Sequence, residues 1–383
     1  MIKSLFSDIN IKKIVLIFIA TRILLIGIGL SARNSSYLSQ ELTGYSYEST
    51  ALGRLGTIFY GADSHWFLKI ADEWYPKVDE KTLVSTGTSL VFFPLYPLLV
   101  KALGLITGNQ LAGILISNIC FLGSGIILYI ALKDKNKELA FKTVKYLFIF
   151  PTSFIFASIL DEPLFLFLFT LLFLFFKKRL YLQSGVVGFF MALTRPFGFL
   201  AFLPIFFVAL PQFKNFNLKE KIKMFFACSL PILGLLVLVI YLKYLSGSYF
   251  AIMLAEKGWN KGFSLNFSQI FYFIFGQLSY PIYLINFIII LSLIFFTFYG
   301  LKNLNVGYKL MAAAVIVISV FTTTQNWHVL SFPRFFAILF PAYIGVGRMG
   351  SESKLFDMVA TGVFLFFQII IFSLWVRGFP MPV

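Results

Sequence analysis

Gly61-Ala-Asp-Ser-His-Trp-Phe-Leu-Lys-Ile-Ala-Asp-Glu-Trp-Tyr75 is a polar and aromatic stretch in a chain whose other long segments are strongly apolar. Seven of the sixteen acidic residues fall between positions 31 and 89, directly after the first apolar segment. The spacing predicts an amphipathic helix with a carboxylate at its start, because one face collects Asp63, Trp66, Phe67, Ile70, Ala71 and Trp74. A second aromatic run, Phe92-Phe-Pro-Leu-Tyr-Pro-Leu-Leu99, follows shortly.

The composition on either side of this stretch excludes a soluble globular protein. Hydrophobic residues make up 59% of the chain and charged residues only 13%. The mean hydropathy is +0.88, and such a chain cannot fold around a soluble core without exposing large apolar patches. A bilayer forces backbone groups to hydrogen-bond internally, so the long Phe, Leu and Ile runs are predicted to be membrane-spanning helices.

The formal net charge of +16 does not indicate a nucleic-acid partner. The basic residues lie in short runs between apolar segments, as expected for the cytoplasmic loops of a membrane protein. Lys3, Lys12 and Lys13 place the N-terminus in the cytoplasm, and a first helix over about 13–30 then delivers residues 31–89 to the outer side. Residues 92–106 contain two prolines and Lys101, and are predicted to form an interfacial or re-entrant helix.

The same charge rule predicts about eleven crossings in all. After the first, the predicted spanning helices cover about 110–132, 146–160, 163–176, 184–195, 197–212, 224–243, 283–301, 309–324, 332–347 and 355–376. We therefore expect an all-α polytopic membrane protein with one domain, residues 1–383. Within it, residues 31–109 form an outer-face catalytic loop with interfacial helices, and residues 110–383 form the transmembrane bundle.

Polar residues from five separate parts of the chain meet on the outer side of this predicted topology. They are Asp63 and His65, Asp161 and Glu162, Thr194 and Arg195, Glu256, and the stretch from Gln325 to Arg334. Ionisable groups at membrane depth are unfavourable and are functional candidates by default. Their gathering on one side predicts a single site.

Each candidate also has a purely structural explanation. Asp63 could cap the helix that follows it, Glu162 could be a favourable first-turn acid beside Pro163, and a single arginine such as Arg334 could extend to the interface. Two arginines on one face, Arg195 and Arg334, are better explained by an anionic ligand, since guanidinium matches phosphate oxygens. Glu256 is expected to be solvated.

Several of these stretches resemble the PIG-V family, which comprises the second mannosyltransferase of glycosylphosphatidylinositol anchor assembly and its prokaryotic relatives. Ala62-Asp-Ser-His-Trp-Phe-Leu-Lys-Ile-Ala71 and the Phe92–Leu98 run look like the family signature. Further similar motifs follow in order: Ser158-Ile-Leu-Asp-Glu-Pro-Leu-Phe165, Ala192-Leu-Thr-Arg-Pro196 and Ser331-Phe-Pro-Arg-Phe335. The chain departs from the family pattern at Ala62, at Leu160-Asp161 and at Phe335.

The resemblance implies a GT-C-like bundle and an inverting transfer of a hexose, by default mannose, from a polyprenyl-phosphate-linked donor to a lipid or glycan acceptor at the outer or lumenal face. We assign Asp63 as the catalytic base, Arg195, Arg334 and His65 to the donor phosphate, and Glu162 and Trp66 to the acceptor. A phosphate leaving group needs no general acid, so one carboxylate base suffices. No cofactor is predicted, although a divalent metal is left open, and membrane lipids are the expected surroundings.

Two other function classes compete with this interpretation. A transporter or flippase for lipid-linked sugars would also use arginines and apolar grooves, but such proteins usually show internal repeats and a polar path through the membrane. A non-catalytic subunit that binds the carrier lipid would not need Asp63. The gathering of polar groups on one side favours the enzyme.

Overall fold

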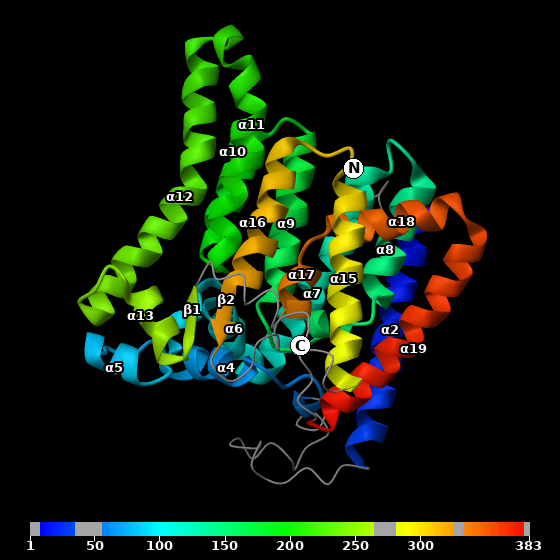
Figure 1. The fold of residues 1–383 in the computed structure, drawn as a ribbon, viewed down its shortest axis with the longest axis horizontal. Helices are drawn as coiled ribbons and strands as arrows, with labels where there is room; N and C mark the ends of the chain where they lie inside the picture. Colours follow the sequence, from blue (N-terminus) through cyan, green and yellow to red (C-terminus); the bar gives the residue numbers. More distant parts are fainter. Residues whose placement is uncertain (1–7, 35–55, 264–280, 325–331, 379–383) are drawn as a thin grey trace.

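The structure is a computed structural model and describes residues 8–34, 56–263, 281–324 and 332–378. The first part contains the helices α2 (Ile9–Asn34), α4 (Ser64–Glu73), α5 (Glu80–Ser85), η2 (Ser89–Val91), α6 (Leu95–Thr107), α7 (Asn109–Leu132), α8 (Lys137–Ile149), η3 (Ser153–Ala157) and α9 (Glu162–Lys177). The second part contains α10 (Tyr181–Ala192), η4 (Pro196–Ala201), α11 (Phe202–Gln212), η5 (Phe213–Asn215), α12 (Leu218–Ser246), α13 (Ala251–Gly258), α15 (Pro281–Leu301), α16 (Val306–Phe321), α17 (Phe332–Ala337), α18 (Pro341–Glu352) and α19 (Lys354–Val376). Figure 1 shows these helices as one bundle, with α10–α12 on one flank and α2 and α19 on the other.

Six helices in the described part of the chain are long and apolar enough to cross a membrane. They cover Ile9–Arg33, Asn109–Leu132, Pro196–Asn215, Leu218–Ser246, Leu284–Leu301 and Lys354–Val376. Helices α6, α10 and α16 are apolar but shorter. The chain is therefore an integral, multi-pass membrane protein, while the total of eleven crossings stays a prediction.

Two predicted spans are broken in the structure. The helix predicted over 146–160 ends at Ile149, and the short 3₁₀ helix η3 follows at Ser153–Ala157. Pro151 explains the break, because it has no N–H to donate and it holds Phe150 in an extended conformation, with ψ 145°. The helix predicted over 332–347 is likewise divided into α17 and α18, and Pro341 begins α18.

The interfacial helix predicted at 92–106 corresponds to α6, which has 13 residues. At 1.5 Å per residue such a helix is roughly 20 Å long, shorter than the roughly 30 Å hydrocarbon core of a bilayer. Gly108, at φ +80°, then turns the chain into α7. Tyr96 on α6 fixes this helix against α7, because its hydroxyl is 3.2 Å from the Gly113 carbonyl and 3.0 Å from Ser117 Oγ.

Close helix contacts in the bundle depend on small residues. A Cβ at Gly300 of α15 would collide with the Pro341 carbonyl of α18, and one at Gly345 of α18 would collide with the Phe296 carbonyl of α15. Backbones that approach this closely are typical of membrane helix interfaces. Aromatic rings fill the interior elsewhere, as in the stacked pair Phe121 and Phe156, whose centroids are 4.7 Å apart.

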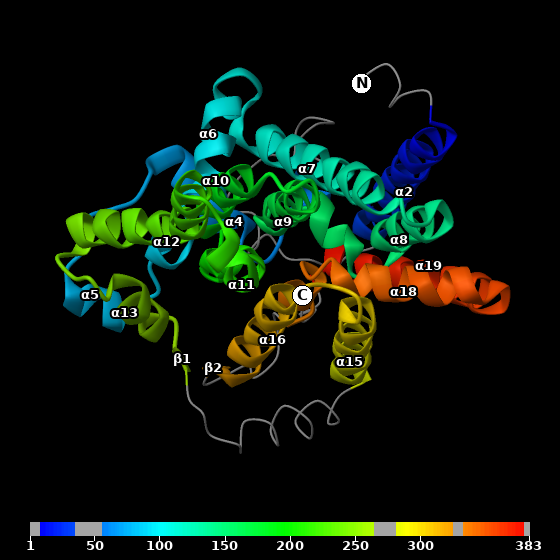
Figure 2. The same ribbon diagram turned by 90° about the horizontal axis from the view of Figure 1, so that it is seen from above.

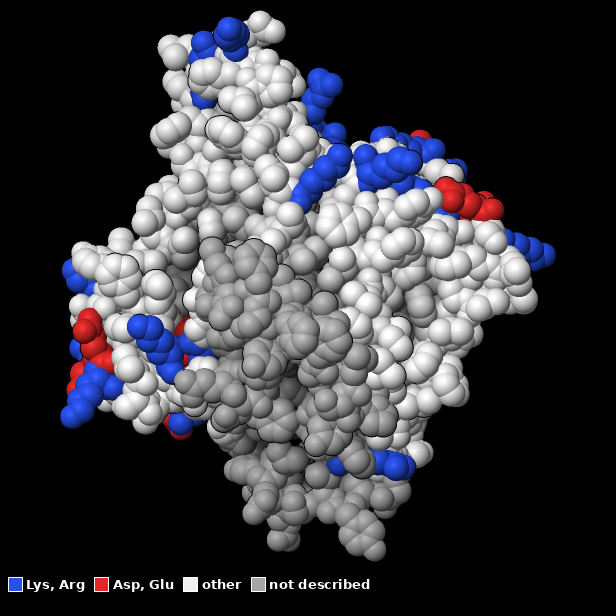
Figure 3. Space-filling model, in the orientation of Figure 1, with Lys and Arg blue, Asp and Glu red and all other residues white. Residues whose placement is uncertain are grey.

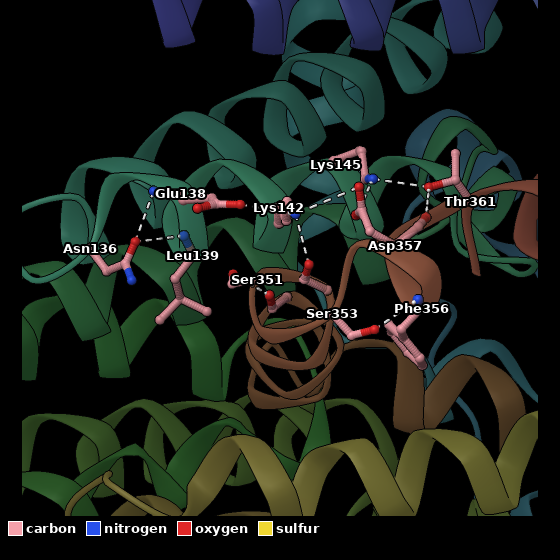
Figure 4. Close-up of polar contacts among 12 residues, drawn as sticks. Asn136, Glu138, Leu139, Lys142, Lys145, Ser351, Ser353, Phe356, Asp357 and Thr361 are labelled. Carbon is pink, nitrogen blue, oxygen red and sulfur yellow. Dashed lines mark hydrogen bonds and ion pairs between the residues drawn. The ribbon is translucent and has the colours of Figure 1, made fainter. Parts of the chain in front are cut away.

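The basic end of the bundle carries a polar network that joins α8 to α18 and α19. Figure 3 shows lysines and arginines gathered at this end, over the tips of α11 and α12 and over α8 and α18. In the network of Figure 4, Lys145 Nζ lies 2.5 Å from Asp357 Oδ1, and Lys142 Nζ lies 3.0 Å from Glu138 Oε1. Lys142 also donates to the Gly350 carbonyl at 2.7 Å. The described ions of this network are paired with one another, so it fastens three helices together.

The opposite end is covered by α4, α5 and α6, with α13 beside them (Figures 1 and 2). Helix α13 shares a small hydrophobic core with this layer, which includes Ile70, Leu83, Leu90, Ala251 and Ala255. The chain is nearly all helical, and its one described sheet lies here. In it β1 (Lys261–Phe263) pairs antiparallel with β2 (Thr322–Thr324), with Gly262 opposite Thr323. This pairing joins the end of α13 to the end of α16.

Candidate functional site

Asp63 precedes α4 but does not cap it. Its side chain makes no capping hydrogen bond. The turn is instead closed by Ser64, whose Oγ donates to the Gly61 carbonyl at 2.7 Å and accepts from the Gly61 N–H at 3.1 Å. Ala62 occupies the left-handed region at φ 47°. The structural explanation of Asp63 as a cap is therefore wrong, and the carboxylate is left for another partner.

That partner is Arg334 on α17. Nη2 of Arg334 lies 2.5 Å from Oδ2 of Asp63. The Arg334 side chain is only 5% exposed, whereas that of Asp63 is 33% exposed. A buried guanidinium and a partly exposed carboxylate thus meet at the layer formed by α4.

Glu162 connects this ion pair to a second one. Its Oε1 lies 3.3 Å from Nε of Arg334 and 2.7 Å from Nη1 of Arg195. The same Nη1 donates to Oδ1 of Asp161 at 2.9 Å. Five charged side chains therefore form one chain of contacts in the order Asp161, Arg195, Glu162, Arg334, Asp63, which we call the charged cluster.

Local structure explains how the inner members are held. Glu162 is the first residue of α9, where the helix dipole favours an acidic side chain, and Pro163 follows at a position that needs no N–H. Arg195 precedes Pro196 and is extended, at φ −152° and ψ 156°, as a residue before proline prefers. The turns before α9 and after α10 thus point their charges toward one another.

Burial sets the charge balance of the cluster. Asp161 lies outside the six candidate spans, and burial raises the pKa of its carboxyl to about 8, against the opposing effect of the Arg195 charge. At a pH below this value the Asp161 carboxyl is neutral, and two carboxylates face the two guanidiniums of the cluster. At a higher pH Asp161 is ionised, and three carboxylates face the same two guanidiniums.

Some nitrogen atoms of the two arginines are not used by the cluster. Within the described residues, Nη1 of Arg334 and Nε of Arg195 are buried and have no hydrogen-bond partner. A guanidinium has five N–H donors in a fixed fork, and unused buried donors are unfavourable unless a ligand accepts from them. This arrangement is suited to an anion such as phosphate.

His65 and Trp66 lie beside the cluster, on the first turn of α4. Their rings meet edge to face, with centroids 5.5 Å apart. Trp66 also stacks on Phe92 at 5.8 Å and meets Trp259 at 5.2 Å. His328, the second histidine of the sequence, lies outside the described residues.

The structure thus brings together Asp63, Glu162, Arg195 and Arg334, and places His65 and Trp66 on the helix that follows Asp63. Among the described residues, no three His, Cys, Asp or Glu side chains lie close enough together to hold a metal ion. The predicted role of each residue stays a prediction at this point.

Three residues of this region were given no role in the predicted site. Asp161 was expected on the outer side with Glu162, and the structure shows that the two acids share Arg195. Glu256 was expected to be solvated, and its side chain is 32% exposed, but its Oε2 atom is buried without a hydrogen-bond partner in the described structure, and burial raises the pKa of the carboxyl. Trp259 follows on the same segment and reaches Trp66. The only sequence signal for these contacts of Glu256 and Trp259 was that an acid and an aromatic ring lie within four residues of each other.

Comparison with known proteins supports the fold. No protein-family model and no curated protein sequence matches this chain. A similar solved structure is that of ArnT from Cupriavidus metallidurans bound to undecaprenyl phosphate, with a TM-score of 0.52 and 10% sequence identity. The match covers 87% of this chain and 59% of the ArnT chain.

The matched structure and the helical architecture together establish the fold class that was predicted. These comparisons do not show membership of the PIG-V family. The chain is an all-α membrane protein with a GT-C-like fold.

Proposed function

We propose that the protein is an inverting glycosyltransferase that moves a hexose, by default mannose, from a polyprenyl-phosphate-linked donor to a lipid or glycan acceptor. The observation that carries this proposal is the charged cluster. It offers two buried arginines to an anion and one partly exposed carboxylate, Asp63, to an acceptor. The ArnT structure, which holds undecaprenyl phosphate, supports a carrier-lipid phosphate as that anion.

The arginines are assigned to the donor phosphate. Nη1 of Arg334 and Nε of Arg195 supply donors that the described residues leave unused. In a site removed from water, such charge-assisted hydrogen bonds are strong and geometrically selective. They would also stabilise the charge that develops on the phosphate as it leaves the sugar. His65, on the adjacent helix, is assigned as a further phosphate contact.

Asp63 is assigned as the base because it is the most accessible acid of the cluster. Its side chain is 33% exposed, against 12% for Asp161 and 1% for Glu162. An acceptor hydroxyl can therefore reach Asp63 first. A donor phosphate that pairs with Arg334 would take the place of the Asp63 carboxylate and leave it ready to accept the hydroxyl proton.

The hydroxyl oxygen of the acceptor then attacks the anomeric carbon as the bond to the phosphate breaks. The new glycosidic bond forms on the face opposite to the leaving phosphate, so the anomeric configuration inverts. The proton passes to Asp63 and the electron pair leaves with the phosphate. Glu162 and Trp66 are assigned to the acceptor, and Glu162 also holds both arginines in place through its Oε1 atom.

The outer or lumenal face is proposed from the charge distribution. Glu162 and Lys177 lie at opposite ends of α9, and Lys177 is followed by Lys178 and Arg179. The charged cluster is therefore at the end of this helix away from the basic loops, which the positive-inside rule assigns to the cytoplasm.

The lipid tail of the donor is assigned to the region of α6. Leu105 and Ile106 on this helix are 85% and 86% exposed. Exposed apolar side chains on a short helix at the membrane surface are suited to the isoprenoid chain of such a donor.

The experiment is to supply the purified protein in nanodiscs with polyprenyl-phosphate-[³H]mannose and a membrane extract, and to follow release of the sugar from the carrier. We expect transfer that Arg334→Gln abolishes and that Arg179→Gln, an exposed arginine at the basic end, leaves intact. A transporter would instead move the intact donor across a proteoliposome membrane without breaking its phosphate bond, and that result would overturn the proposal.

A further inference from the structure

The short helix α13 places a tryptophan and an acid beside Asp63 that no assigned role uses. Trp259 ends this helix, and its ring centroid lies 5.2 Å from that of Trp66 and 6.1 Å from that of Phe92. Trp259 is fixed in place because its Nε1 donates to the Thr88 carbonyl at 3.0 Å. The three rings are each partly exposed, and Trp259 lies at 77° to the plane of Trp66 and at 89° to that of Phe92. We call these three rings the aromatic platform.

A flexible side chain, that of Lys69, lies over the Trp66 ring of the platform. Phe92 stacks on Trp66 at an interplanar angle of 15°. The Lys69 ammonium lies 5.6 Å from the centroid of the Trp66 ring. A flexible lysine side chain is displaced more easily than a side chain packed in the core. A ligand ring can therefore take the place of Lys69 on the Trp66 indole.

Glu256 lies one turn before Trp259 and has an incomplete set of partners. Its side chain is 32% exposed, but its Oε2 atom, which lies 4.0 Å from Lys261 Nζ, is buried and has no hydrogen-bond partner among the described residues. Burial raises the pKa of this carboxyl, and the nearby charge of Asp63 adds to the effect. Glu256 is therefore a hydrogen-bonding group on the same side of the molecule as the base.

We propose that Trp66, Trp259 and Glu256 form a sugar-binding subsite for the acceptor, which makes the acceptor a glycan or glycolipid sugar and not a simple lipid alcohol. This inference rests on the proposed function, since it concerns the group that receives the hexose. The aromatic platform contacts the apolar C–H face of the sugar ring. The Glu256 carboxylate accepts hydrogen bonds from its hydroxyl groups.

Other acceptor classes fit these residues poorly. A hydrocarbon chain at this position would leave the Glu256 oxygen buried without a partner, which is unfavourable. A phosphate headgroup would face two carboxylates, those of Glu256 and Asp63, and like charges repel. A sugar satisfies both the rings and the carboxylate, because it combines an apolar face with hydroxyl donors.

The test uses the full-length protein in nanodiscs, with polyprenyl-phosphate-[³H]mannose as donor and either methyl α-mannoside or diacylglycerol as acceptor. We expect transfer to methyl α-mannoside. Glu256→Gln should raise KM for this acceptor by about tenfold or more, with KM for the donor changed by less than about twofold. Trp259→Ala should act in the same direction, and Trp259→Phe, which keeps a ring and is less disruptive, should act more weakly. Glu73→Gln, an exposed acid on α4, should leave both KM values unchanged.

Equilibrium binding of methyl α-mannoside, measured by calorimetry without donor, separates the inference from the proposed function. Glu256-dependent binding without any transfer would support the subsite and overturn the proposed function. Transfer to diacylglycerol alone, or a KM for methyl α-mannoside that Glu256→Gln does not change, would overturn the subsite while the proposed function stands. Neither binding nor transfer by the wild type would overturn both.

Discussion

The guanidinium of Arg334 and the carboxylate of Asp63 meet at 2.5 Å, although 271 positions separate the two residues in the sequence. The contact joins α17, near the end of the chain, to the turn before α4, near its beginning. Through Glu162 it continues to Arg195, so four widely spaced segments depend on one another. The candidate site therefore exists only when the whole bundle is assembled.

Arg334→Lys tests the geometry of the phosphate contact. Lysine keeps the charge but loses the fork of the guanidinium, so we expect kcat/KM for the donor to fall by about 10²-fold or more while the protein stays folded. Steady-state kinetics with polyprenyl-phosphate-mannose measures this. A variant that works as well as the wild type would mean that Arg334 supplies charge alone.

Glu162→Gln tests the buried connection between the arginines. Removing one partner of a buried ion pair leaves uncompensated charge, which typically destabilises a protein by about 3–5 kcal/mol. We expect a clear drop in the melting temperature in detergent. Glu138→Gln, whose carboxylate is 61% exposed and paired only with Lys142, should lower it far less. Equal melting temperatures for the two variants would contradict the arrangement.

Asp161 predicts a dependence of stability on pH. Its folded pKa, about 8, is above the ordinary value of 3.8, so between these values the folded state binds more protons than the unfolded state. The free energy of unfolding should therefore fall as pH rises from about 5 to 8, through loss of the Asp161 proton. Asp161→Asn should flatten this slope in melting curves recorded across that range, and an unchanged slope would assign it to other groups.

Asp357→Asn provides a control at the far end of the bundle. It weakens the contacts of Lys145 and Lys142 in the network that joins α8 to α18 and α19. Since these side chains are partly exposed, we expect a modest loss of stability, about 1 kcal/mol, and unchanged sugar transfer at a temperature where the variant is folded. Loss of transfer by a folded Asp357→Asn protein would show that this network acts on the site.

The sequence was sufficient for the class of fold and for most of the charged cluster. Apolar run length and basic loops indicate membrane helices and their direction, and residues at the same end of neighbouring helices are then expected to lie close together. Asp63, Glu162, Arg195 and Arg334 could be grouped in this way. Which acid pairs with which arginine could not be predicted, because side-chain contacts depend on the rotation of each helix.

Two features of the structure, the helix break at Pro151 and the environment of Glu256, could not be predicted from the sequence. Pro151 sits inside a run that is apolar on both sides, so hydropathy alone predicted a continuous helix where the structure has a break. The partial burial of Glu256 follows from the packing of α13 on α5 and on the segment after α4, which no local pattern records. From the sequence alone, a charged residue in a short loop is predicted to be solvated, because the side chains that pack against it are not known.

The most direct test of the account is transfer of labelled mannose from polyprenyl-phosphate-mannose by the purified wild type and by Asp63→Asn. Glu73→Gln serves as the control acid at the other end of α4, and monodispersity in detergent checks folding. The account predicts transfer by the wild type and by Glu73→Gln, and a loss of about 10²-fold or more for Asp63→Asn. Equal transfer by a folded Asp63→Asn protein would contradict the assignment of Asp63 as the base.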